Sequence, residues 1–194
     1  MRHYYENLDS DVQAAMQEAI EKFRELGVEI VEVDIPSVTQ MRGAAMNIMM
    51  GEMLAVHKHW LDTCPDDYGS DVRMFLESAG QVPLLDYLQA QRARQAFTDE
   101  FLNALSKVDV LLTPATPLTA PTADNYEDAL RLTSFTAQTV LTGLPSLSMP
   151  CGFSSAGMPV NMQLIGRPFD EATVLGIGYV YELNTDWHTR HPNL

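Results

Sequence analysis

The sequence predicts a single α/β domain in which helices flank a parallel or mixed β-sheet. Amphipathic helical patterns and short runs of β-branched residues recur along the whole chain. The opening segment follows the order helix, glycine, strand, which is typical of α/β folds. The chain has 194 residues, of which 46% are hydrophobic, and this is enough for one domain with its own core. We therefore expect residues 1–194 to form one domain.

The first helix is predicted to begin at Asp9 and Ser10, which are good N-cap types, because apolar side chains follow at helical spacing as far as Leu26. Gly27 should end this helix, since glycine readily adopts the positive φ that closes many helices. The β-branched run at residues 28–33 is then predicted to be a strand.

More helices and strands are predicted further along the chain. Helical spacing predicts helices over residues 38–63, 71–78, 84–105, 126–141 and 169–183. Short β-rich runs predict strands over residues 108–113, 147–153 and 160–165. The last two strands should form a hairpin, because the short loop between them contains glycine. The five methionines from Met41 to Met53 are interpreted as adaptable core packing.

Composition argues against several classes of function. The chain has 26 acidic and 12 basic residues, and its net charge of −14 repels phosphate backbones and anionic lipids. Its two cysteines, Cys64 and Cys151, form no disulfide framework and are expected to be reduced. The first residues lack the apolar run of a secretory signal, and no stretch predicts a membrane span. We expect a cytoplasmic protein that binds neither nucleic acid nor membranes.

The residues alone indicate no reaction. Ser154 and Ser155 lie between two predicted strands and are interpreted as a turn, and Cys151 is interpreted as a buried structural thiol. The spacing of the histidines indicates no metal site, and the following four are expected to be exposed: His57, His59, His188 and His191. No glycine-rich phosphate-binding motif occurs. We expect no catalytic residue, no metal and no cofactor in this chain.

Residues 132–166 contain no Asp, Glu, Lys or Arg, so this stretch should be buried or should cover another surface. Within and beyond it, FTAQTVLTGLPSLSMPCG (135–152) and GMPVNMQLIGRPFDE (157–171) resemble a block of the amidase signature family. DVLLTPATP (109–117) and DYLQAQRAR (86–94) resemble the strand and helix that precede that block. The similarity is collinear and covers nearly the whole chain.

This resemblance implies a partial amidase-signature fold, a mixed β-sheet flanked by helices, and a role in the hydrolysis of carboxylic amides. The family's serine nucleophile, second serine and lysine base belong to an N-terminal region that has no counterpart here. Lys22, Lys58 and Lys107 are the chain's lysines, and none lies in the family's catalytic context. The chain resembles the C-terminal portion of an amidase, and we expect it to be inactive alone.

The resemblance also implies that this portion supplies part of the substrate-pocket wall. The expected substrate-binding residues are Thr133, Thr136, Gln138 and Thr139. The alternative is that the threonines only cap and pack a helix. Two positions depart from the family pattern, which usually has Asn in place of Val140 and Gly in place of Asn161.

Three functions remain open at this point. The chain is a portion of an amidase-type hydrolase, a non-catalytic binding or self-association module, or a half that complements a separate N-terminal amidase half. The half that complements a separate amidase half includes, as a subtype, an aminoacyl-tRNA amidotransferase A-type subunit. The expected partners are a small-molecule amide in the complete enzyme and either a second copy or the missing half, because a truncated sheet exposes an unpaired edge.

Overall fold

The computed structural model describes residues 2–191, apart from the side chains of residues 2, 3 and 126. Its helices are α1 (Ser10–Glu25), α2 (Val38–Thr63), α3 (Ser70–Ala79), α4 (Leu84–Leu105), α5 (Tyr126–Arg131), α6 (Ala137–Thr142) and α7 (Glu171–Leu183). Its strands are β1 (Leu111–Pro114), β2 (Ser146–Phe153) and β3 (Pro159–Ile165). The predicted α/β class is confirmed.

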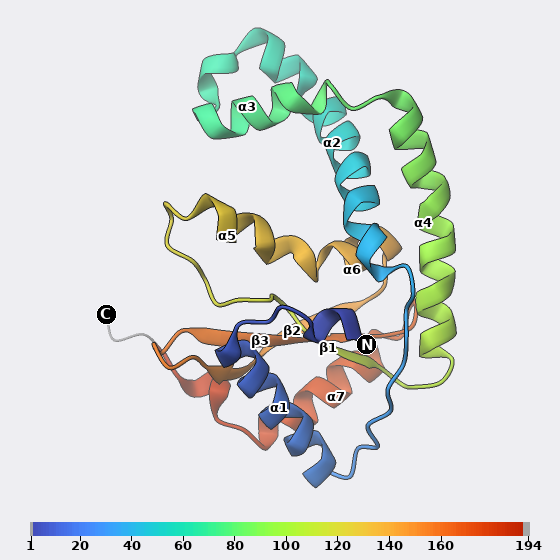
Figure 1. Cartoon of the computed structure of the whole chain (residues 1–194), viewed down its shortest axis with the longest axis vertical. Coiled ribbons are helices and arrows are strands. Elements are labelled where there is room, and N and C mark those ends of the chain that lie inside the picture. Colours follow the sequence, from blue (N-terminus) through green and yellow to red (C-terminus); the bar gives the residue numbers. More distant parts are fainter. Residues whose placement is uncertain (1, 192–194) are drawn as a thin grey trace.

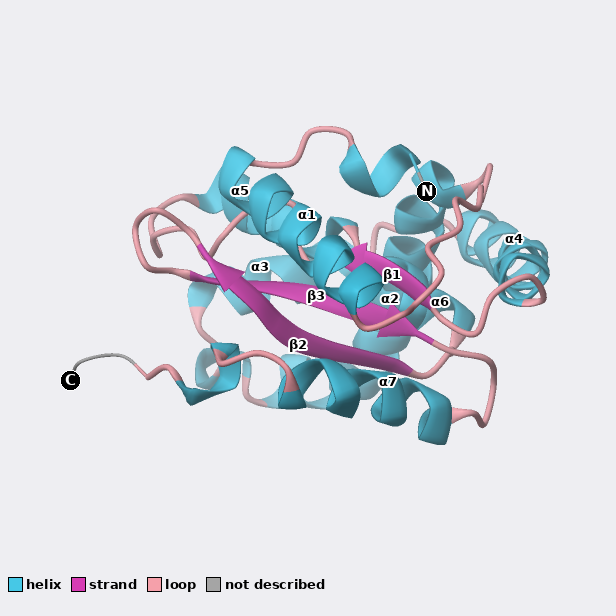
Figure 2. Ribbon diagram, turned by 90° about the horizontal axis from the view of Figure 1, so that it is seen from below, coloured by secondary structure: helices cyan, strands magenta, loops and turns pink. Residues whose placement is uncertain are grey.

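The described strands form one sheet in the order β1-β3-β2, and both pairings are antiparallel (Figure 2). The hairpin predicted for the last two strands is therefore confirmed, with a bulge between Pro150 and Gly152. The strand predicted over residues 28–33 is wrong, because this segment has no regular secondary structure and pairs with no described strand. β-branched residues favour a pleated surface only where a neighbouring strand is available. Without that strand, the described sheet has no parallel pair.

Helices pack on both faces of the sheet (Figure 1). Helices α1 and α7 cover one face, where Met162 and Leu164 of β3 join their core. Ile165 points to the other face and joins the cluster formed with α2, α4 and α6. This alternation is the expected consequence of the pleat, which turns successive side chains to opposite faces. Helices α2, α3 and α4 extend from the sheet as an arm.

Several predicted boundaries agree with the structure. The helices over residues 38–63 and 84–105 are confirmed at both ends. The first helix ends where predicted, and Gly27 has a φ of 84°. The last helix begins only at Glu171, because Phe169 has a φ of 61°, which is not helical.

The helix predicted over residues 126–141 is wrong as one element. It is divided into α5, a 3₁₀ turn (Leu132–Ser134) and α6. The interruption places Phe135 in the core, where its ring lies 5.1 Å from the ring of Tyr4, measured between centroids. Tertiary packing of an aromatic side chain here outweighs the local preference for a continuous helix.

Candidate functional site

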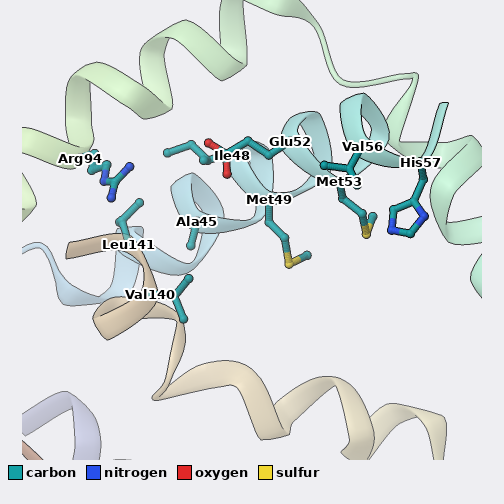
Figure 3. A pocket seen from close by; sticks show the side chains of 10 residues that line it. All are labelled: Ala45, Ile48, Met49, Glu52, Met53, Val56, His57, Arg94, Val140 and Leu141. Carbon is teal, nitrogen blue, oxygen red and sulfur yellow. The ribbon is translucent and has the colours of Figure 1, made fainter. Parts of the chain in front are cut away.

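A cavity of about 380 Å³ lies between α2, α4 and α6 (Figure 3). Its wall consists mainly of apolar side chains, together with one acid, one imidazole and one guanidinium. The lining residues are Ala45, Ile48, Met49, Glu52, Met53, Val56, His57, Arg94, Val140 and Leu141. A mostly apolar cavity with a few polar groups is typical of small-molecule sites.

Helix α2 supplies most of this wall because its lining residues recur three or four positions apart and share one face. Met49 and Met53 therefore border the cavity (Figure 3). The prediction of core packing is confirmed for Met41, which is fully buried, and is wrong for Met49, which is 41% exposed. Methionine suits such a wall, since its flexible side chain adapts to different ligand shapes.

Helix α6 contributes Val140 and Leu141, two neighbours in the uncharged stretch. Val140 is 74% exposed. It stands where the resemblance led us to expect Asn, so this departure from the family pattern lies in the cavity wall. The cavity consequently has a methyl surface at a point where an amide side chain was expected.

The four residues expected to bind substrate lie together on the segment that enters α6. Thr133 is exposed, and its hydroxyl donates to the carbonyl of Leu130 at 3.5 Å. The Thr139 hydroxyl donates to the carbonyl of Thr136 at 2.9 Å. Gln138 is 1% exposed and donates through Nε2 to the carbonyl of Ser134 at 2.9 Å.

None of these four is among the residues that line the cavity. Their hydrogen bonds are the local back-bonds expected of hydroxyl and amide side chains in and beside short helices. Gln138 nevertheless keeps one group free, because its buried Oε1 accepts no hydrogen bond from the described residues. A buried acceptor without a donor is uncommon in native proteins.

The polar residues of the wall come from two helices. Arg94 of α4 is half-buried, and its guanidinium forms no hydrogen bond or ion pair within residues 2–191. His57 of α2 was expected to be exposed and is instead half-buried. Its Nδ1 lies 3.0 Å from the Tyr68 hydroxyl. Glu52 is exposed at the cavity rim. The cavity therefore offers both a positive and a negative group to a bound molecule.

Sequence reasoning missed α2 and Arg94 as parts of this site. Only a weak signal in the sequence indicated a site on α2. The apolar face of residues 38–63 is wider than packing against one neighbouring helix requires. The cavity depends on three helices that meet only in the folded chain.

The nucleophile candidates lie elsewhere and are structural. Ser154 accepts a hydrogen bond from the Met158 backbone at 3.0 Å, and Ser155 donates to Asp11 Oδ2 at 3.0 Å, so the predicted turn is confirmed. Cys151 is fully buried as predicted, and burial raises the pKa of its thiol to about 12. A thiol with that pKa is not ionised at neutral pH and cannot act as an activated nucleophile.

Serine, cysteine, threonine and lysine are all absent from the ten residues that line the cavity. Over the described part of the chain, no group of three or more His, Cys, Asp or Glu side chains could hold a metal ion. Within the same residues, no helix combines the length and the apolar character needed to cross a bilayer. The arrangement can hold a small, largely apolar molecule, but it contains no nucleophile beside a base.

Fold and cavity together describe an α/β unit with a mostly apolar cavity between three helices. A family model described as Amidase matches residues 1–175, and the chain belongs to the amidase signature family. The resemblance seen in the sequence is thereby confirmed.

Named relatives and a solved structure agree with this assignment. The chain is 38% identical to an amidase from Pseudomonas putida over 99% of this chain and 43% of that protein. It is 34% identical to the A subunit of a glutamyl-tRNA(Gln) amidotransferase from Synechococcus sp. (strain JA-3-3Ab), over 97% of this chain and 42% of that protein. A crystal structure of an amidase superposes with a TM-score of 0.84 and 25% identity, over 94% of this chain and 44% of the other. The chain therefore spans less than half the length of these proteins.

Proposed function

We propose that the chain is the pocket-bearing portion of an amidase-type hydrolase that cleaves carboxylic amides with a serine nucleophile outside this chain. The observation that carries the proposal is the cavity between α2, α4 and α6, which is shaped for a small molecule but has no nucleophile in its wall. Acyl transfer needs an activated nucleophile and donors that stabilise an oxyanion, in addition to a binding surface. The chain alone is therefore inactive.

The apolar wall suits the hydrocarbon part of an amide, which gains free energy when its surface leaves water. Thr133, Thr136, Gln138 and Thr139 are proposed to bind the polar part, beside Val140 and Leu141 on the same segment. Gln138 Oε1 is a buried acceptor that no described residue satisfies, but it lies outside the cavity wall, so a substrate N–H reaches it only if the α6 segment moves.

The first test exposes the purified chain to a fluorophosphonate, which reacts with activated serines, and determines the intact mass. We expect no adduct on the folded chain and no hydrolysis of simple aliphatic or aryl amides. A stoichiometric adduct that disappears when the chain is denatured before labelling would overturn the proposal, because it would reveal an activated serine among residues 1–194.

The second test supplies the missing part. The chain is co-expressed with the complementary segment of the Pseudomonas putida amidase, which this chain matches over 43% of its length. We expect amide hydrolysis only in the mixture, and we expect Val140→Asn to change KM more than kcat. A mixture that forms a stable complex but hydrolyses no amide would favour a non-catalytic binding module.

A second subtype is supported by the similarity to an amidotransferase A subunit. In this case the complementary segment comes from that amidotransferase, and the substrate tested is glutamine. Release of ammonia from glutamine, but not from aliphatic amides, would identify the amidotransferase subtype. The reverse preference would identify an amidase.

We further propose that the chain works in the cytoplasm, with a complementary amidase segment or a second copy as its partner. Cys64 and Cys151 are both free, as expected in a reducing compartment. The net charge of −14 supports the expectation that neither nucleic acid nor an anionic membrane is a partner.

A further inference from the structure

The outer face of α7 is apolar although it faces solvent. Leu175, Tyr179 and Leu183 are 58%, 61% and 65% exposed. Together with the smaller exposed residues between them they form a surface that we call the α7 face: Ala172, Leu175, Gly176, Tyr179, Val180 and Leu183. Figure 2 shows α7 at the rim of the molecule beside β2, and no described element lies over its outer side. A helix that is apolar all round is expected in a buried position, so this face lacks its partner.

The two small residues of the α7 face, Ala172 and Gly176, lie in a self-complementary order with two large ones, Leu183 and Tyr179. If two copies of α7 pack antiparallel about a two-fold axis between residues 177 and 178, Gly176 lies opposite Tyr179. In the same register, Ala172 lies opposite Leu183. In these two pairs a large side chain meets a small residue on the other copy, which allows the two helices to approach closely.

Space is available where this packing requires it. A Cβ added at Gly176 would meet no atom within 4 Å, so the surface above this glycine is open. A tyrosine ring from a second helix can therefore lie against the backbone of α7 at that point. The third pair of positions, Leu175 opposite Val180, joins two branched aliphatic side chains.

We infer that the α7 face is a homodimer interface, occupied by the same face of a second copy in an antiparallel, two-fold arrangement. The face itself adds no charge repulsion against this occupant. The chain carries a net charge of −14, but α7 has no charged residue between Glu171 and Glu182. Two acidic copies can meet here with little opposition between like charges.

The size of the α7 face sets the strength of the dimer. The exposed fractions correspond to roughly 500 Å² of surface on each copy, or on the order of 1,000 Å² for a symmetric pair, the lower limit for a specific interface. An interface of this size is expected to be weak or transient. Acidic residues outside the face repel across the pair, so added salt tightens it.

The first experiment is sedimentation equilibrium of the full chain over a range of protein and salt concentrations. A monomer–dimer equilibrium is expected. Gly176→Leu should raise the dissociation constant by about ten-fold or more, because the new side chain occupies the space that Tyr179 of the second copy needs. The monomer should remain folded, since the added side chain points into open space and leucine is a better helix former than glycine.

A matched pair of leucines provides the control. Leu183→Gln changes a residue of the α7 face that is 65% exposed, and Leu85→Gln changes a residue of α4 that is 62% exposed. Only the first should weaken the dimer. A chain that stays monomeric at all concentrations, or a dimer that neither Gly176→Leu nor Leu183→Gln weakens, would overturn the inference.

The second experiment tests the antiparallel register. In a chain with Cys64→Ser, the variants Leu175→Cys and Val180→Cys are mixed and treated with a short thiol cross-linker. Cross-links between the two variants should form faster than cross-links within either one. Faster linking of like positions would contradict the proposed register.

Discussion

Gly178 packs directly against Leu147: a Cβ added at Gly178 would lie 2.3 Å from Leu147 Cδ2. This contact brings α7 close to β2, so any substituent larger than hydrogen at Gly178 requires the Leu147 side chain or the helix to shift. Gly176, two residues earlier on the same helix, has open space instead. Substituting alanine at these two glycines of α7 is therefore expected to change the stability of the chain in opposite directions.

Gly178→Ala should destabilise the chain by about 1–3 kcal/mol, because the new methyl group forces Leu147 or the helix to move in a packed core. Gly176→Ala should stabilise it by about 0.5–1 kcal/mol, since alanine loses less backbone entropy in a helix and meets no neighbour. Urea unfolding at low protein concentration measures both free energies in the monomer. Equal effects of the two substitutions would contradict the packing described for α7.

Val140→Asn should leave the free energy of unfolding within about 0.5 kcal/mol, because the side chain is 74% exposed. It should weaken binding of an apolar amide such as 4-phenylbutyramide several-fold, since a polar group replaces a methyl surface in the cavity wall. Ligand-observed NMR titration measures the affinity. Val72→Asn on α3 is the control, because Val72 is also exposed but lies outside the cavity. Equal losses from both variants would show that the ligand binds elsewhere.

Glu100→Ala should destabilise the chain by about 1–3 kcal/mol, because the Glu100 carboxylate accepts two hydrogen bonds from Ser37 at the start of α2. Its Oε2 lies 3.0 Å from the backbone nitrogen and its Oε1 lies 2.7 Å from the hydroxyl. Asp99→Ala, on the neighbouring residue of α4, is the control, since among the described residues the Asp99 carboxylate accepts a hydrogen bond from Gln95 alone, on the same helix. Thermal unfolding followed by circular dichroism should show a lower Tm for the first variant than for the control.

The chain should lose stability at alkaline pH through Cys151. Burial is the main cause that raises the pKa of its thiol from 9.0 to about 12, and the charge of Glu18 adds to it. The folded pKa is above the unfolded value, so the neutral thiol contributes its full stability below pH 9 and loses it as the pH rises towards 12. Tyr181 titrates in an overlapping range, since burial also raises its pKa to about 12.

Cys151→Ala should therefore flatten the fall in the free energy of unfolding between about pH 9 and pH 11, measured by urea titration at each pH. Cys64→Ala should keep the slope of the parent chain. At neutral pH, iodoacetamide should modify Cys64 first, because Cys151 is fully buried. Rapid alkylation of Cys151 in the folded chain would contradict this assignment.

Local sequence patterns predicted the long elements well. Residues 84–105 form a helix with the predicted ends, because Pro83 and the apolar spacing mark the start and the length. The pattern at residues 28–33 failed, since a strand needs a neighbour that the local sequence does not specify. The prediction of one helix over residues 126–141 failed because it did not include the break at Phe135. That break depends on contact with Tyr4, which is remote in sequence.

The cavity was harder to predict than the fold. The sequence pointed to the right segment but to other residues of it, because Val140 and Leu141 line the cavity and the four predicted residues do not. The wall from α2 depends on how the helices pack in the folded chain. Thr133 and Thr139 were predicted to bind substrate because they carry hydroxyl groups. In the structure these hydroxyls donate to nearby backbone carbonyls, which sequence alone did not indicate. Arg94 shows no sequence signal, because a half-buried position for a guanidinium follows only from tertiary packing.

The cluster that joins Tyr4 to Ile165 has a consequence for synthesis on the ribosome. The cluster includes Phe135 and residues of α2, α4 and α6. It therefore cannot pack completely until most of the chain has left the exit tunnel. Helix α2 can form early, but its apolar face must wait for partners made much later. During that interval the apolar face of α2 stays uncovered, so slowing translation near residue 165 should lengthen the time for which the nascent chain is prone to aggregate.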